Sequence, residues 1–213
     1  PALPYTVLNE LICWHLARSI LLPIPPGFII ESDEKPHYVS LNFNLSGEDL
    51  PPADATLISQ NHLGLSCGII LFDMWVVNDD RHDRNIMRDR STNKVHIFDH
   101  SLAFLQGNDI RTRLDNSRDL PGIGSHCLVE RITRVDDMTR WFERINSLPE
   151  FYIREIIHHM VDIGLLHGMV DFCTDFLLER RKNLINIARN NRHIFRELEP
   201  GLWDVLDMEG NLQ

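Results

Sequence analysis

The side chains best suited to chemistry lie in one polar loop and at the end of the apolar segment that follows it. Asp80 and Asn85 stand five residues apart in the loop, and Asp99 comes fourteen residues after Asn85. A carboxylate can accept a hydrogen bond from an attacking hydroxyl, and an amide oxygen with a second carboxylate can hold Mg²⁺. The order and spacing therefore predict a phosphoryl-transfer site, with Asp80 at the hydroxyl and Asn85 and Asp99 as metal ligands.

An apolar segment precedes the polar loop, and a second apolar segment precedes Asp99. Residues 69–77 are nearly all apolar and lead into the loop, and residues 95–98 end directly before Asp99. A crowded polar loop is usually a solvated turn, so an acid and an asparagine at this spacing are weak evidence by themselves. A helix that is apolar all round is usually buried. A buried helix that leads into the loop and an acid at the end of a strand occur here together. This combination favours a functional site over a solvated turn.

Composition limits the classes of function. The chain has 213 residues, of which 43% are hydrophobic and 24% are charged, as in an ordinary globular protein with one core or two lobes. The net charge of −10 disfavours a general binder of nucleic acids or membrane surfaces. None of the four cysteines forms a C-x-x-C pair, and no apolar run is long enough to cross a membrane. We expect a cytoplasmic protein with reduced thiols.

The hydrophobic patterning predicts an α+β chain, in which a helix and a small sheet precede a mostly helical body with one buried hairpin. A polar, proline-containing connector places the domain boundary near residue 50, giving a partial N-terminal lobe over 1–50 and a C-terminal lobe over 51–213. The predicted helices cover 6–22, 55–77, 126–146, 149–164 and 168–193, the predicted strands cover 28–30, 37–43, 86–87 and 95–98, and residues 101–125 are predicted to form a long irregular loop.

Several motifs resemble those of a known family. Asp80-Arg81-His82-x-x-Asn85 with His96-Ile97-x-Asp99 is similar to the catalytic and metal-binding loops of kinases with the order Asp-Arg-His, which include phosphatidylinositol 3- and 4-kinases and HipA-like kinases. Leu8-Asn9-Glu10-Leu11-Ile12 and the proline-rich turn at 22–26 resemble the opening of small stand-alone HipA-like kinases, and Asp99-His100-Ser101 resembles their Asp-His-Gly segment.

The resemblance implies a protein-kinase-like fold with a reduced or truncated N-terminal lobe, ATP and Mg²⁺ in its cleft, and a protein serine or threonine as the phosphate acceptor. By motif match, Asp80 is catalytic and His82 lies beside the metal-binding acid or the γ-phosphate. Asn85 and Asp99 hold the metal, and Glu10 pairs with the lysine that anchors ATP. The resemblance also implies a growth-arresting toxin with a small DNA-binding antitoxin as its partner.

The chain departs from the family pattern before Glu10. No lysine or arginine precedes this residue, although the ATP-anchoring lysine should lie on a strand before it. Either the strands that carry it lie outside the given residues, or the protein lacks them. In the second case, the alternative function is a degenerate kinase domain that binds or regulates a partner without catalysis.

Two further interpretations stay open from the sequence. His82, His96 and His100 could join the acids in a transition-metal site for hydrolysis. Five arginines on or near the irregular segment form either a solvated face or a site for an acidic peptide or a phosphate. These arginines are Arg111, Arg113, Arg118, Arg131 and Arg134.

Overall fold

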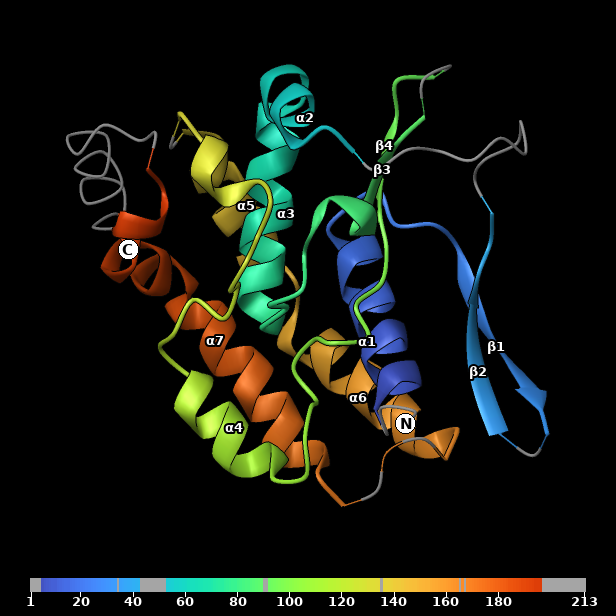
Figure 1. Ribbon diagram of the computed structural model, residues 1–213. Helices are drawn as coiled ribbons and strands as arrows, with labels where there is room; N and C mark the ends of the chain where they lie inside the picture. The colour runs from blue at the N-terminus through green and yellow to red at the C-terminus, as the bar shows by residue number, and fades with distance from the viewer. Residues whose placement is uncertain are drawn as a thin grey trace.

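A computed structural model describes residues 5–33, 35–42, 53–89, 92–134, 136–164, 166 and 168–196. Within these ranges the protein is α+β, mostly helical, with two separate two-stranded sheets (Figure 1). The elements follow in the order α1 (Thr6–Ser19), β1 (Gly27–Ser32), β2 (Lys35–Ser40), α2 (Ala55–Asn61), α3 (Leu63–Val76), the 3₁₀ turn η1 (Asp83–Asn85), β3 (Ile86–Arg88), β4 (Val95–Ile97), α4 (Ile110–Ser117), η2 (Val129–Arg131), α5 (Asp136–Asn146), α6 (Glu150–Asp162), α7 (Val170–Asn190) and η3 (Arg192–Ile194).

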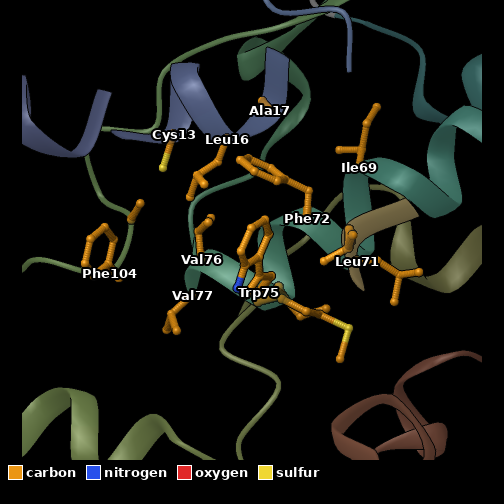
Figure 2. Close-up of a cluster of buried hydrophobic side chains, with 14 of the residues drawn as sticks. Cys13, Leu16, Ala17, Ile69, Leu71, Phe72, Trp75, Val76, Val77 and Phe104 are labelled. Atoms are coloured by element: carbon orange, nitrogen blue, oxygen red, sulfur yellow. The ribbon is translucent and has the colours of Figure 1, made fainter. Parts of the chain in front are cut away.

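Helix α3 forms the centre of the helical body. Eleven of its fourteen residues are buried, and it packs against α5 and α7. Side chains of α1, of α3 and of the segment after β4 meet in one apolar cluster, among them Leu16, Phe72 and Phe104 (Figure 2). The indole nitrogen of Trp75 donates to the carbonyl of Leu177 on α7 at 2.8 Å. Because its neighbours surround α3, the C-terminal end of this helix has a fixed position in the core. The polar loop begins at that end.

The single helix predicted over 55–77 is wrong, because the structure breaks it at His62. Helices α2 and α3 meet at an angle of 115°, and His62 leaves the helical conformation with φ −138° and ψ 42°. The bend lets Trp141 of α5 lie against the start of α3, where its indole nitrogen donates to the carbonyl of Gly64 at 2.5 Å. A Cβ at Gly68 would lie 2.3 Å from the Trp141 ring, so only glycine permits this contact.

Among the described residues, no single helix is long and apolar enough to cross a membrane. Only the sharply bent pair of α2 and α3 reaches that length and apolarity together.

Both predicted hairpins are present. Strands β1 and β2 pair antiparallel, with Ile30 opposite His37. Strands β3 and β4 also pair antiparallel, with Ile86 opposite Ile97. The second hairpin is short and half of its strand residues are buried, and it holds the end of the polar loop next to the segment that begins at Asp99.

The segment between β4 and α5 differs from the prediction in two places. Helix α4 lies inside the region predicted to be irregular, and the Asp109 side chain caps it by accepting from the backbone nitrogen of Thr112 at 3.1 Å. The helix predicted to begin at residue 126 begins only at Asp136. The backbone near residue 126 is instead hydrogen-bonded to the polar loop, since the nitrogen of Cys127 donates to the carbonyl of Arg81 at 2.9 Å.

The connector on which we placed the domain boundary lies mostly outside the described residues, as does the acidic tail from residue 197. The division into 1–50 and 51–213 therefore stays a prediction.

Candidate functional site

The loop that carries the predicted site begins where α3 ends. Val77 takes the left-handed conformation with φ +53°, which is unusual for a β-branched residue. The next residue turns back, and the backbone nitrogen of Asn78 donates to the carbonyl of Asp73 at 2.9 Å. This sharp turn directs the chain out of the core, so that burial ends at Asn78, Asp79 is exposed and Asp80 is partly exposed.

Asp73 is the buried anchor of the loop, although sequence reasoning missed it. Its carboxylate accepts from Arg81 Nε at 2.8 Å and from Arg81 Nη2 at 3.1 Å, a two-point ion pair in which both side chains are fully buried. The Asn78 amide adds a third bond at 2.9 Å. Burial by itself would raise the pKa of Asp73, but the Arg81 guanidinium and the hydrogen bond from His126 hold it well below its usual range.

His126 ties a distant segment to the same carboxylate. Its Nδ1 accepts from the backbone nitrogen of Leu128 at 3.2 Å, so the neutral ring carries its proton on Nε2, which lies 3.2 Å from Asp73 Oδ2. Burial lowers the pKa of His126, which favours this neutral form. The two residues are separated by 53 positions in the chain, so only the tertiary fold reveals their contact.

Arg81 joins the loop to the paired strands. Its Nη1 donates to the carbonyls of Asn85 at 2.9 Å and Phe98 at 2.6 Å. The nitrogen of Phe98 in turn donates to the carbonyl of Asn85 at 3.3 Å. The residue before β3 and the residue before Asp99 are thereby held side by side.

Asp80 and His82 lie on the exposed side of the loop. Asp80 Oδ2 is 4.0 Å from His82 Nε2, and their side chains are 40% and 44% exposed. His82 Nδ1 accepts from the nitrogen of Arg84 at 3.1 Å, which fixes the ring and leaves Nε2 toward Asp80. A partly exposed carboxylate on a loop anchored from below can meet a hydroxyl that arrives from solvent.

Asn85 and Asp99 each use one atom to hold the local backbone. Asn85 is buried, and its Nδ2 donates to the carbonyl of Asp80 at 2.9 Å, which leaves Oδ1 as the atom for a ligand. Asp99 is exposed and has φ +57°, and its Oδ1 accepts from Ser101 Oγ at 2.7 Å. The remaining donors are hard oxygens, and Mg²⁺ takes few protein ligands because it keeps waters and phosphate oxygens. The donor set therefore fits Mg²⁺.

Glu10 reaches this segment from α1. Its Oε1 accepts from the backbone nitrogen of His100 at 2.9 Å. Burial raises the pKa of Glu10 to about 7, against that hydrogen bond, and the neighbouring Asp99 adds to the rise. In the described part of the chain no lysine forms an ion pair with Glu10. Here the residue braces the segment of the predicted metal ligand, and the lysine partner implied by the resemblance stays a prediction.

Asn9, the neighbour of Glu10, holds the other end of the same segment. Its Nδ2 donates to the carbonyls of Ser101 at 2.9 Å and Leu105 at 2.8 Å, and its Oδ1 accepts from the nitrogen of Leu105 at 3.1 Å. Two adjacent residues of α1 thus clamp the backbone that follows β4. The sequence contains this Asn-Glu pair, but the pattern alone does not indicate what the pair holds.

The structure disfavours the transition-metal alternative. The ring of His100 is fully buried, and its Nε2 lies 2.7 Å from Arg81 Nη2, so that nitrogen accepts from the guanidinium and cannot bind a cation. Burial lowers the pKa of His100 to about 3. Across the residues that the structure describes, no group of three or more His, Cys, Asp or Glu side chains could hold a metal ion.

A buried helix leads into the Asp-Arg-His loop, and a short hairpin and a braced acid follow it, which is the arrangement expected for a kinase-like fold. The solved structure of the proinflammatory kinase CtkA of Helicobacter pylori has the same fold, with a TM-score of 0.64 and 15% sequence identity. The similarity covers 98% of this chain and 85% of that chain.

The family follows from a second comparison. Residues 3–117 match the family described as HipA-like kinase, and this match spans more than half of the chain and includes all five predicted site residues. The chain belongs to the HipA-like kinase family. No protein with a curated description matches it.

Proposed function

We propose that the chain is an ATP- and Mg²⁺-dependent kinase that phosphorylates serine or threonine of a protein. The observation that carries the proposal is the pair of bonds from Arg81 to the carbonyls of Asn85 and Phe98. These bonds hold one predicted metal ligand and the residue before the other next to the loop that presents Asp80. In this proposal, α1 and the β1–β2 hairpin belong to the N-terminal lobe.

Each residue has a role in this scheme. Asp80 accepts the hydrogen bond of the attacking hydroxyl and orients it, and His82 lies beside Asp80 as a second polar contact for the transferred group. The carbonyl oxygen of Asn85 and the carboxylate of Asp99 would hold Mg²⁺, which when bound neutralises the phosphate oxygens of ATP. Glu10 keeps Asp99 in place through the backbone of His100.

A degenerate kinase domain is the second candidate, and one observation favours it. Glu10 is buried with a raised pKa and has no lysine partner among the described residues, so the cation that would anchor the ATP phosphates has no counterpart there. In that case the same clamp on residues 99–105 would serve only to hold a surface for a partner.

Transfer of labelled γ-phosphate to a protein, or to the chain itself, tests the first candidate. Asp80→Asn should lower the rate by about 10² to 10⁴-fold, the usual contribution of a positioned acid or base. Asp83→Asn, a neutralisation three residues away in the same loop, should leave most of the rate. Equal rates in the two variants would contradict the role of Asp80, and label on an inositol lipid would redirect the substrate class.

A further inference from the structure

The arginines of the segment between β4 and α5 differ in what they contact. Arg118 and Arg134 form ion pairs with nearby carboxylates. Arg111 lies on the ring of Phe172, 4.7 Å from its centroid. In the described part of the chain Arg131 forms no ion pair, and it lines a pocket of about 520 Å³ between α2 and η2.

The guanidinium of Arg131 is held in place by neutral partners. Its Nε donates to Thr56 Oγ1 at 3.1 Å, and its Nη1 donates to the carbonyl of Cys127 at 2.9 Å. The side chain is half-buried. These two bonds fix the plane of the guanidinium at the wall of the pocket. Its Nη2 is left as a donor for a ligand.

The rest of the pocket adds donors for an anion. Thr56, Gln60 and Thr133 contribute two hydroxyls and an amide. Arg196 lies at the same pocket, where its Nη1 is 3.1 Å from Glu130 Oε1. The pocket therefore carries one net positive charge in a chain whose total is −10. A phosphate monoester matches this set, because its oxygens accept several charge-assisted hydrogen bonds and its charge opposes that of arginine.

The walls of the pocket are bonded to the proposed catalytic loop. The nitrogen of Cys127, which precedes η2, donates to the carbonyl of Arg81 at 2.9 Å, and the nitrogen of Ala53, which precedes α2, donates to the carbonyl of Asp83 at 3.0 Å. We propose that this pocket binds a phosphorylated serine or threonine side chain of a protein through Arg131. The pocket has room for more than a phosphate, and its walls are joined to the loop that carries Asp80, so under the proposed function it would hold a protein substrate near that loop.

Titration of the ¹⁵N-labelled chain with N-acetyl-phosphoserine amide tests the proposal without any use of catalysis, so its outcome is independent of the proposed kinase activity. Signals of Thr56, Arg131 and Thr133 should move, and those of Asp80 and Asn85 should not. Arg131→Gln should weaken binding about tenfold or more, since a charged hydrogen-bonded pair is lost.

Three variants make the test specific. Arg134→Gln, an arginine three residues further on that is paired with Asp136, should bind the probe as the parent does. Glu130→Gln should tighten binding, because a negative charge leaves the pocket. Arg131→Lys keeps the charge and loses the planar donor pair, so it should weaken binding several-fold even if Arg131→Gln is too unstable to measure.

Other outcomes would overturn the proposal. Equal binding by Arg131→Gln and Arg134→Gln, or signal changes at Asp80 instead of the pocket, would place the anion elsewhere. Equal binding of N-acetylserine amide would show that the phosphate is not recognised. Inorganic phosphate that binds as tightly as the phosphoserine probe would make the pocket a site for a free anion and not for a protein side chain.

Discussion

A carboxyl group that is buried beside another carboxylate holds its proton to unusually high pH, and Glu10 is in this position. Its folded-state pKa is about 7 against an ordinary value of 4.5. The folded state therefore binds the proton more tightly than the unfolded state does. The resulting stabilisation is fully present below pH 4.5 and is lost as the pH rises through 7.

The loss of this stabilisation with rising pH leads to a prediction for the metal-free protein. Between pH 4.5 and pH 8 the free energy of unfolding should fall by about 3 kcal/mol through Glu10, as a shift of this size implies. Glu10→Gln keeps an acceptor for the nitrogen of His100 and cannot titrate, so it should remove this part of the pH dependence. Urea denaturation of both proteins in EDTA measures the difference. Parallel pH profiles, or a parent that gains stability relative to the variant, would contradict the argument.

At the scale of single residues the sequence indicated the family but not the supports of the site. The spacing of Asp80, Asn85 and Asp99 indicated a kinase pattern only together with the Asp-Arg-His order and the apolar segments around it, all of which lie within one local stretch. Asp73 and His126 were missed, since their contact joins positions 53 apart that no local pattern relates. One signal was available for Asp73, the single acid in an otherwise apolar run. A charge at such a position needs a buried partner, which Arg81 supplies.

Helix α3 and helix α7 are joined at the point where the loop begins, and Arg180 makes the joint. This fully buried side chain donates through Nε to the carbonyl of Trp75 at 3.1 Å and through Nη1 to the carbonyls of Arg118 and Leu120 at 3.1 Å each. It also donates to the carbonyl of Met74. A cation at the C-terminal end of a helix is favourable, and burial lowers the pKa of Arg180 only to about 10, so it stays charged.

Arg180→Met should lower the free energy of unfolding by about 3 kcal/mol or more, because several buried carbonyls lose their donor. Lys182→Ala is the matched control on the same helix. Lys182 is exposed and pairs with Glu150, so its loss should cost less than about 1 kcal/mol. Urea denaturation compares the two. Similar urea midpoints in the two variants would show that water hydrogen-bonds the exposed carbonyls and that the contacts of Arg180 are not needed for stability.

Elements with a strong local signal were predicted correctly, and elements set by tertiary contacts were not. The hairpin of β3 and β4 follows from two apolar runs around a polar turn. The break at His62 was missed although Gly64 lies two residues further on, because the apolar run continues through it and the contact with Trp141 on the following turn is seen only in the tertiary structure. Helix α4 is short and polar, so hydrophobic periodicity did not reveal it, although Asp109 supplied an N-cap signal.

The molecule has the kinase-like fold that the motifs implied, and nucleotide binding is a property of this fold as a whole. Under the proposed function, MgATP at about 100 times its Kd should stabilise the folded state by about 2.7 kcal/mol, which corresponds to a rise in Tm of roughly 5 to 10 °C for a chain of this size. Asp99→Asn removes a predicted metal ligand and should abolish the rise, while Asp83→Asn should keep it. Thermal unfolding with and without MgATP makes the measurement. If the Tm of the parent does not change with nucleotide and metal, the degenerate domain is favoured, because a protein cannot transfer a phosphate from a nucleotide that it does not bind.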